Sequence, residues 1–254
     1  MTYRHDVKLT ILLNWKSFLR PQDKETSEIE RNFIMKPLLE YGNYYHIYNR
    51  GNNYENIFID GKDYQHFLKL VHIYIDTVAD IFVWCLMKNH FHILIRIKED
   101  SEIGYLNSEN SKSENSEIKW KTYFKEAPSK EFYKKPDPTQ QFKHLFNAYS
   151  RWFNIRHSRR GSLFEKNYER KLVGSQKQLI NLIIYIQNNP VKHGFVKHTE
   201  EYQWTSYHTI ISKEPTILKR QEIITYFNDL ENLKYLHKRI EPEMDENIID
   251  LVFE

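Results

Sequence analysis

The chain has 254 residues, of which 40% are hydrophobic and 15% aromatic, a composition that excludes wholesale disorder and can bury a sizeable core. Its net charge of +3 is only mildly basic, and the single cysteine, Cys85, excludes an intramolecular disulfide and a cysteine-based zinc cage. No apolar run reaches the roughly 18 residues of a transmembrane helix, so we expect a cytoplasmic protein.

Hydrophobic periodicity and turn residues predict six core elements. In chain order they are a strand over residues 44–49, a helix after Asp60, strands over 81–87 and 90–97, a helix over 139–156 and a strand near 163–173. The order of strands and helices is that of the split βαβ, ferredoxin-like arrangement in the α+β class. Its antiparallel sheet carries helices on one face and can leave the other face open for ligands.

The rest of the chain is assigned around this core. Residues 1–38 form an N-terminal extension, 39–210 the main domain with a polar, low-complexity insertion at about 99–139, and 211–254 a C-terminal helical tail. A further helix begins at Ser175, with Gln178 at the capping-box position. We expect Pro190 to end or kink that helix.

Two histidines, His90 and His92, are two residues apart on the strand predicted over residues 90–97. Successive strand side chains point to opposite faces, so His90 and His92 share one face while Phe91 and Ile93 share the apolar core face. The two histidines lie about 7 Å apart along the strand. Their imidazoles can therefore bind one divalent cation together. Taken alone, such a pair is more often a surface feature or a hydrogen-bonded pair.

The helix that begins at Ser175 offers two further candidates. Tyr185 and Asn189 are four residues apart and are neighbours on the helix surface. Tyr185 is a candidate nucleophile, although a phenol with a pKa of about 10 needs a nearby cation or base to attack. Asn189 is a candidate metal ligand through its amide oxygen. Each has a structural role as the alternative. For Tyr185 it is only to pack its ring in the core, and for Asn189, which precedes Pro190, it is only to end the helix.

Together these residues predict a metal-assisted enzyme that cuts single-stranded DNA. A divalent cation bound by His90, His92 and Asn189 would neutralise and orient a phosphodiester. Attack by Tyr185 would form a covalent 5′-phosphotyrosine and free a 3′-hydroxyl, which conserves the bond energy for rejoining.

A basic segment with interleaved aromatic residues lies between Lys143 and Lys171. Cations that contact phosphates and rings that stack on bases form a path for a single-stranded nucleic acid. A solvated amphipathic helix is the plainer alternative. The candidate DNA-binding residues are Arg50, Asn52, Arg151, Arg156, Arg159, Arg160, Lys166, Arg170 and Lys171, and the aromatic residues are Phe142, Tyr149, Trp152, Phe153, Phe164 and Tyr168.

Five blocks of the sequence resemble the single-tyrosine HUH transposases, and most closely their REP-associated tyrosine transposase branch. The blocks are YHIYNRG at 45–51, MKNHFHILI at 87–95, RRGSLF at 159–164, YIQNNPVK at 185–192 and YQWTSY at 202–207. The resemblance implies a ferredoxin-like nuclease that uses Mg²⁺ or Mn²⁺ and acts on single-stranded DNA next to an imperfect hairpin. Such a protein would be associated with the nucleoid when it binds DNA.

The resemblance also assigns roles to residues. His90 and His92 take the ligand positions, Tyr185 takes the nucleophile position, and Asn189 stands where insertion-sequence relatives have a glutamine ligand. Lys88 departs from the proline that is common in the family. The family contains dimers that exchange the tyrosine helix as well as monomers, so the resemblance leaves open whether this chain forms a homodimer.

Three other interpretations compete with this one. A histidine-triad nucleotide hydrolase needs a third histidine at position 94, which is Leu94. A rolling-circle initiator or relaxase shares the chemistry but usually orders its motifs differently or adds a helicase. A non-catalytic protein that binds hairpin DNA or RNA on the same fold is the alternative from another class, and the retained His90, His92, Tyr185 and Asn189 argue against it.

Overall fold

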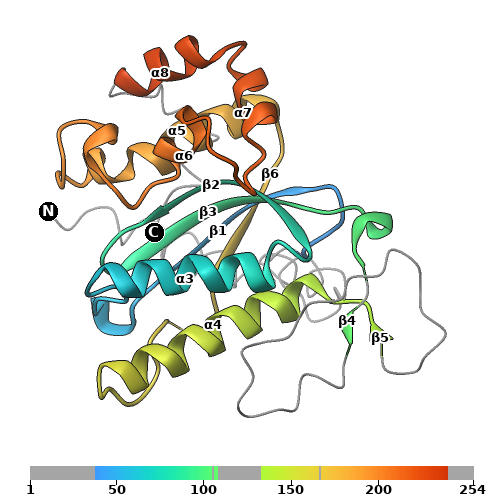
Figure 1. Ribbon diagram of the computed structural model, residues 1–254, viewed down its shortest axis with the longest axis vertical. Helices are drawn as coiled ribbons and strands as arrows, with labels where there is room; N and C mark the ends of the chain where they lie inside the picture. Colours follow the sequence, from blue (N-terminus) through green and yellow to red (C-terminus); the bar gives the residue numbers. More distant parts are fainter. Residues whose placement is uncertain (1–37, 105, 108–132, 166, 240–254) are drawn as a thin grey trace, which may run out of the picture. The chain divides into compact units, whose positions relative to one another are not determined.

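The computed structural model describes residues 38–104, 106–107, 133–165 and 167–239 (Figure 1). Four strands form one antiparallel sheet in the order β2-β3-β1-β6. The strands are β1 (Tyr44–Arg50), β2 (Ala79–Leu86), β3 (His90–Ile97) and β6 (Glu169–Val173). A helix connects β1 to β2 and another precedes β6, which is the split βαβ order. The predicted α+β fold is confirmed.

Helices α3 (Gly61–Tyr74) and α4 (Pro138–Arg156) cover one face of the sheet (Figure 1). Each begins at an aspartate whose side chain accepts a hydrogen bond from a backbone N–H of the first turn. Asp60 accepts at 2.9 Å and Asp137 at 2.8 Å. These caps satisfy donors that the helix itself leaves unpaired.

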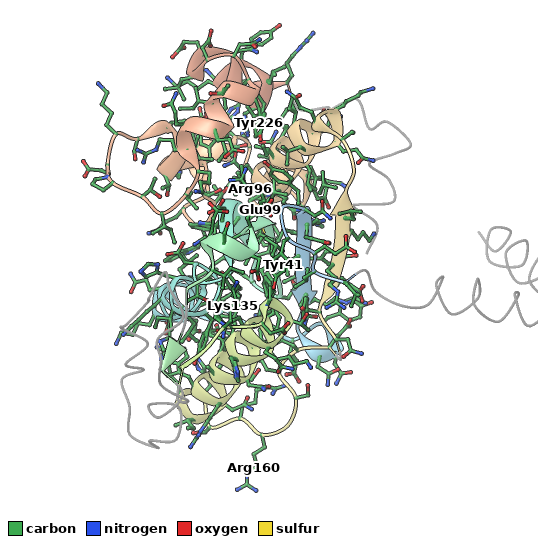
Figure 2. All side chains as sticks on the ribbon, turned by 90° about the vertical axis from the view of Figure 1, so that its right-hand side faces the viewer. Tyr41, Arg96, Glu99, Lys135, Arg160 and Tyr226 are labelled. Atoms are coloured by element: carbon green, nitrogen blue, oxygen red, sulfur yellow. The ribbon has the colours of Figure 1, made fainter. Side chains whose placement is uncertain are left out.

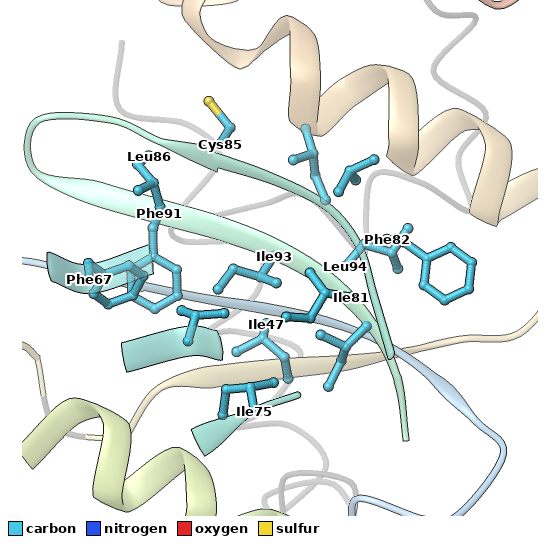
Figure 3. Close-up of a cluster of buried hydrophobic side chains, with 14 of the residues drawn as sticks. Ile47, Phe67, Ile75, Ile81, Phe82, Cys85, Leu86, Phe91, Ile93 and Leu94 are labelled. Atoms are coloured by element: carbon cyan, nitrogen blue, oxygen red, sulfur yellow. The ribbon is translucent and has the colours of Figure 1, made fainter. Parts of the chain in front are cut away.

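The core between these helices and the sheet is aromatic. The centroid of the Phe91 ring of β3 lies 5.0 Å from that of the Phe67 ring of α3 (Figure 3). It lies 5.7 Å from the centroid of the Phe146 ring of α4. Ile93 and Ile95 continue the same side of β3 and are buried. This is the apolar face that the alternation of β3 predicts.

The second face of the sheet, which the fold could have left open for ligands, is covered over β2 and β3. Helix α5 (Gln176–Lys192) lies across β2 and β3 on the side away from α3 and α4 (Figure 1). Its apolar residues Leu182, Ile183 and Ile186 are fully buried. A helix with such a stripe buries it against the nearest apolar surface, and here that surface is the sheet.

The two ends of α5 differ from the expectation. Ser175 caps the helix by accepting from Gln178 N at 3.2 Å, while Gln178 Oε1 accepts from Gly174 N at 2.8 Å, one residue before the capping-box position. The helix continues through Pro190 to Lys192. An end at Pro190 was therefore wrong, because the last turn of the helix accommodates the missing N–H of the proline, and a kink there stays a prediction.

Three short helices follow α5 in the described part of the chain, and the last of them packs against α5. They are α6 (Tyr207–Ile211), α7 (Arg220–Tyr226) and α8 (Leu230–Lys238), preceded by the 3-10 turn η4 (Thr199–Glu201). His237 Nε2 of α8 lies 2.7 Å from Gln187 Oε1, and Asn188 Nδ2 donates to the His237 carbonyl at 3.1 Å. Side chains of α5 that point away from the sheet are held in this way.

Three smaller elements complete the described part of the chain. They are η1 (Asn52–Tyr54), η2 (Asp100–Glu102) and the short ladder of β4 (Leu106–Asn107) with β5 (Tyr133–Lys134). Most of the predicted insertion, the N-terminal extension up to residue 37 and residues 240–254 lie outside the described residues. The strand that was expected from about residue 163 begins only at Glu169, after the left-handed Asn167.

Among the helices that the structure describes, none combines the length and the apolar character needed to cross a membrane.

Candidate functional site

Strands β1 and β3 bring three histidines together beneath α5. In the register of the two strands Tyr48 lies opposite His92, and Arg50 lies opposite His90. His90 and His92 are 6% and 1% exposed, and their ring centroids are 5.2 Å apart. His46 joins them from β1, where it shares a face with Tyr48.

Helix α5 adds the predicted nucleophile, Tyr185, and the predicted third metal ligand, Asn189. The Tyr185 ring meets the His92 ring edge to face, with 5.9 Å between the centroids. One turn later, Asn189 Oδ1 lies 3.4 Å from His90 Nε2. The structure thus brings Tyr185 and Asn189 into contact with the histidine pair.

The surroundings of His90 fit a divalent cation. Its Nδ1 lies 2.8 Å from Asn89 Oδ1 and its Nε2 lies 3.4 Å from Asn189 Oδ1. A neutral imidazole has only one N–H, so it cannot donate to both amide oxygens. If Nδ1 donates to Asn89, the Nε2 lone pair faces the Asn189 oxygen, which is how two ligands of one cation are arranged.

The donor set depends on an amide. Within the described residues, no three side chains of the His, Cys, Asp and Glu types are grouped so that they could hold a metal. His90 and His92 would therefore need Asn189 as the third protein ligand. Asn189 is fully buried, and its Nδ2 has no hydrogen-bond partner among the described residues. Its position is therefore not explained by hydrogen bonds of that nitrogen.

His46 is a member of the site that sequence reasoning missed. Its Nε2 lies 3.0 Å from His92 Nδ1, and the two rings stack with centroids 5.1 Å apart. Burial, followed by the charges of His46 and His90, holds the pKa of His92 well below its usual 6.5. His92 is therefore neutral at pH 7, which is the form that binds metals. The alternation of His46 with Tyr48 on the predicted strand was the available signal.

The end of α5 contributes two further groups that were not predicted. Lys192 Nζ lies 4.7 Å from the centroid of the Tyr185 ring. The His193 ring lies 5.5 Å from the His90 ring. A cation beside a phenol favours the phenolate form, so Lys192 is suited to assist a tyrosine nucleophile.

Two of the candidate DNA-binding residues lie on the face of the histidines. Lys171 is opposite His46 in the register of β6 with β1, and its Nζ lies 5.7 Å from the Tyr48 ring centroid. Arg50 follows at the end of β1, where its Nε donates to Glu165 Oε1 at 2.8 Å. Both cations lie on strands that carry or pair with the histidines, and their contacts with DNA stay predictions.

The other candidates are dispersed. Arg156 pairs with Asp60 at 2.6 Å, Arg159 pairs with Glu55 at 2.8 Å, and Arg170 stacks on Tyr168 at 5.6 Å. Arg151 and Arg160 are exposed, and Figure 2 shows Arg160 projecting into solvent. Asn52 belongs to the turn η1, and Lys166 lies outside the described residues. Their DNA contacts stay predictions.

The aromatic residues of the basic segment are core residues, which corrects their interpretation as stacking surfaces for bases. Each is buried except Trp152, which is half-buried. The buried ones are Phe142, Tyr149, Phe153, Phe164 and Tyr168. The amphipathic periodicity of α4 accounts for Phe142, Tyr149 and Phe153, while Phe164 and Tyr168 join the same core from the segment after that helix.

No protein-family model matches the chain. A curated protein of Haemophilus influenzae that is named as a REP-associated tyrosine transposase is 25% identical over 135 residues, which cover 51% of this chain and 60% of that protein. A solved structure described as a REP-associated tyrosine transposase bound to a REP hairpin has a TM-score of 0.45 and 14% sequence identity, covering 71% of this chain and 87% of that chain. The curated relative supports the resemblance of this chain to the REP-associated tyrosine transposases.

Proposed function

We propose that this protein cleaves and rejoins single-stranded DNA next to hairpins through a 5′-phosphotyrosine. Tyr185 is the nucleophile, and His90, His92 and Asn189 hold Mg²⁺ or Mn²⁺. One observation carries the proposal: a single helix, α5, presents Tyr185 to His92 and Asn189 to His90, at 5.9 Å between rings and 3.4 Å between atoms. The name of the curated relative supports the same class of reaction.

A bound divalent cation would supply charge neutralisation at the phosphodiester and hold it in line for attack. The Tyr185 oxygen forms a bond to phosphorus while the bond from phosphorus to the 3′ oxygen breaks, and the phenol proton ends on the released 3′-hydroxyl. Lys192, 4.7 Å from the Tyr185 ring centroid, favours loss of that proton. Rejoining reverses the same bonds with the 3′-hydroxyl of another strand.

Burial of the site adds a requirement. Tyr185 is 5% exposed and His92 is 1% exposed. A phosphodiester reaches them only if surrounding groups move when DNA binds, as happens in a substantial minority of complexes. This burial is the observation that favours the alternative, a hairpin-binding protein without catalysis.

The first experiment tests the nucleophile. The protein is incubated with Mn²⁺ and single-stranded hairpin oligonucleotides from the DNA that flanks its gene, and a covalent adduct is sought on a denaturing gel. We expect an adduct that is absent with Tyr185→Phe and with EDTA. Tyr149→Phe, which removes a buried hydroxyl on the opposite face of the sheet, serves as the matched control. Binding without any adduct would favour the non-catalytic alternative.

The second experiment tests the cation separately. Mn²⁺ is titrated into the protein in a calorimeter without DNA. We expect His90→Ala, His92→Ala and Asn189→Ala to weaken Mn²⁺ binding, while hairpin binding measured in EDTA largely survives. If either histidine variant loses hairpin binding as much as cleavage, the division between metal binding and DNA binding is wrong.

A further inference from the structure

The turn after β1 presents an exposed aromatic ring on a strained backbone. Tyr54 is 67% exposed. Its φ is 60° and that of the preceding Asn53 is 54°. Residues other than glycine seldom adopt this left-handed conformation, and for a bulky side chain it is an outlier that the surroundings must enforce. Such strain is concentrated at functional sites.

Several contacts fix the turn against the β2–β3 hairpin. Gly51 N donates to the Asn89 carbonyl at 2.7 Å, and Ile57 N donates to the Lys88 carbonyl at 2.8 Å. A Cβ on Gly51 would lie 2.0 Å from the Glu55 carbonyl oxygen, so only glycine allows the chain to turn so tightly here. The backbone on both sides of Tyr54 is therefore anchored to residues 88–89.

The same β2–β3 turn contacts His90, a proposed metal ligand. Asn89 Oδ1 lies 2.8 Å from His90 Nδ1, and Arg50 lies opposite His90 in the strand register. The guanidinium carbon of Arg50 lies 4.6 Å from the centroid of the Tyr54 ring, and Glu165 holds the Arg50 Nε at 2.8 Å. The turn that carries Tyr54 is thus held against the same β2–β3 turn that contacts His90.

We propose that Tyr54, supported by Arg50, is a stacking platform for one base of the single-stranded DNA close to the cleaved phosphodiester. This inference rests on the proposed function. A base stacks on any exposed aromatic face with little dependence on its sequence, and a neighbouring arginine adds attraction for the phosphate backbone. Tyr54 combines an exposed ring, a neighbouring guanidinium and a turn that is anchored to Asn89, the residue next to His90.

The chain offers a matched control for an exposed tyrosine beside an arginine. Tyr235 on α8 is 55% exposed, and the Arg239 guanidinium carbon lies 5.4 Å from its ring centroid. Tyr235 lies on a helix and has no contact with the β2–β3 turn among those that the structure describes. A general effect of removing such a ring would weaken DNA binding at both positions. A stacking platform would weaken it only when the ring of Tyr54 is removed.

The test measures binding without cleavage. Fluorescence anisotropy in EDTA gives the affinity of the full chain for a hairpin oligonucleotide with a single-stranded flank. Tyr54→Gly removes the ring, and glycine accepts a φ of 60° without strain, so this variant is expected to fold. We expect it to bind about 5- to 150-fold more weakly, which is the usual loss for one stacked base. Tyr54→Phe should bind like the wild type, and so should Tyr235→Ala.

An abasic scan locates the stacked base. Each flanking nucleotide is replaced in turn by an abasic one. One position should weaken binding to the wild type by a factor similar to that of Tyr54→Gly, and that position should have no effect on Tyr54→Gly itself. Identical scans for wild type and Tyr54→Gly, or an equal loss with Tyr235→Ala, would overturn the inference.

The outcomes separate this inference from the proposed function. If the wild type forms the Tyr185 adduct while Tyr54→Gly binds normally, only the stacking platform is wrong. If the Tyr54 effect is present but no adduct forms, the platform stands on a non-catalytic binding protein. If the wild type binds none of the oligonucleotides, both are wrong.

Discussion

The two faces of β3 are both buried, but one carries apolar side chains and the other carries polar ones. Toward α3 and α4, Phe91 and Ile93 are at most 1% exposed and lie among other apolar side chains. Toward α5, His90 and His92 are 6% and 1% exposed and face Tyr185 and Asn189. Burial on the first face is favourable at about 25 cal/mol per Å² of apolar surface. Burial of amides, phenols and imidazoles is unfavourable unless each polar atom finds a partner.

This difference shows how a site can be recognised within a core. The polar face stays folded because the rest of the domain stabilises it, and its side chains are only partly satisfied by one another. Asn189 Nδ2, for example, is buried without a hydrogen-bond partner in the described part of the chain. Matched substitutions on the two faces should therefore separate stability from activity.

The largest separation is expected from the same substitution on each face. Tyr185→Phe should abolish the covalent adduct, because no hydroxyl remains to form the phosphotyrosine. Tyr149→Phe should leave the adduct unchanged and lower the free energy of unfolding by about 1 kcal/mol, because the Tyr149 hydroxyl donates to the Ile57 carbonyl at 2.6 Å. Denaturing gels and urea unfolding measure the two effects. A normal adduct with Tyr185→Phe would remove Tyr185 as the nucleophile.

A second pair compares neighbours in the chain. Phe91→Ala should destabilise the fold by about 3–5 kcal/mol, because it opens a cavity between Phe67 and Phe146. His92→Ala should lose Mn²⁺ binding, with a smaller destabilisation of about 1–3 kcal/mol from the loss of the hydrogen bond between His46 and His92. Urea unfolding and Mn²⁺ calorimetry distinguish the two variants. Loss of Mn²⁺ affinity in folded Phe91→Ala equal to that in His92→Ala would contradict the division between the faces.

The sequence was sufficient for the fold because its signals are local. The alternation of Phe91, His92 and Ile93 determines which side chains of the strand share a face. The spacing of the apolar residues in α5 determines which side of that helix packs against the sheet. The position of α5 over the second face could not be predicted, because it depends on the path that the chain takes after β6. The exact end of α5 also escaped prediction, since Pro190 is tolerated within the last turn.

Prediction of the site was partial for a related reason. Tyr185 and Asn189 could be paired from their spacing on one helix. His46 lies 46 positions from His92, and only strand pairing brings their rings within 5.1 Å. The arginines show a different limit, because the charge of a residue in a sequence does not reveal whether an acidic side chain will lie beside it in the fold. Arg156 and Arg159 meet Asp60 and Glu55.

Acid should destabilise the anchor of α5 through His237. Burial lowers the pKa of His237 from 6.5 to about 4, so between these values the unfolded chain binds more protons than the folded one. The free energy of unfolding should therefore fall as the pH drops from about 6.5 to about 4, by up to about 3 kcal/mol. His237→Gln should remove this part of the pH dependence in unfolding titrations.

His208, which is exposed on α6, provides the control for that titration. His208→Gln should leave the pH dependence that comes from His237 in place, because it does not alter the contacts of His237 with Gln187 and Leu233. The buried His92 contributes with the same sign as His237, so a residual slope is expected in His237→Gln. Equal pH profiles for His237→Gln and the wild type would contradict a neutral His237 in the folded protein.

The smallest effects concern the first turns of the helices on the two faces. Ser175→Ala and Asp137→Ala each remove a side chain that accepts a backbone N–H, at 3.2 Å in α5 and 2.8 Å in α4. Each should lower the free energy of unfolding by about 1 kcal/mol. Neither should change adduct formation, because Tyr185 lies in the half of α5 that Gln187 and Asn188 anchor to α8. A Ser175→Ala variant that loses the adduct while staying folded would show that the active face depends on the whole of α5 and not on that anchor.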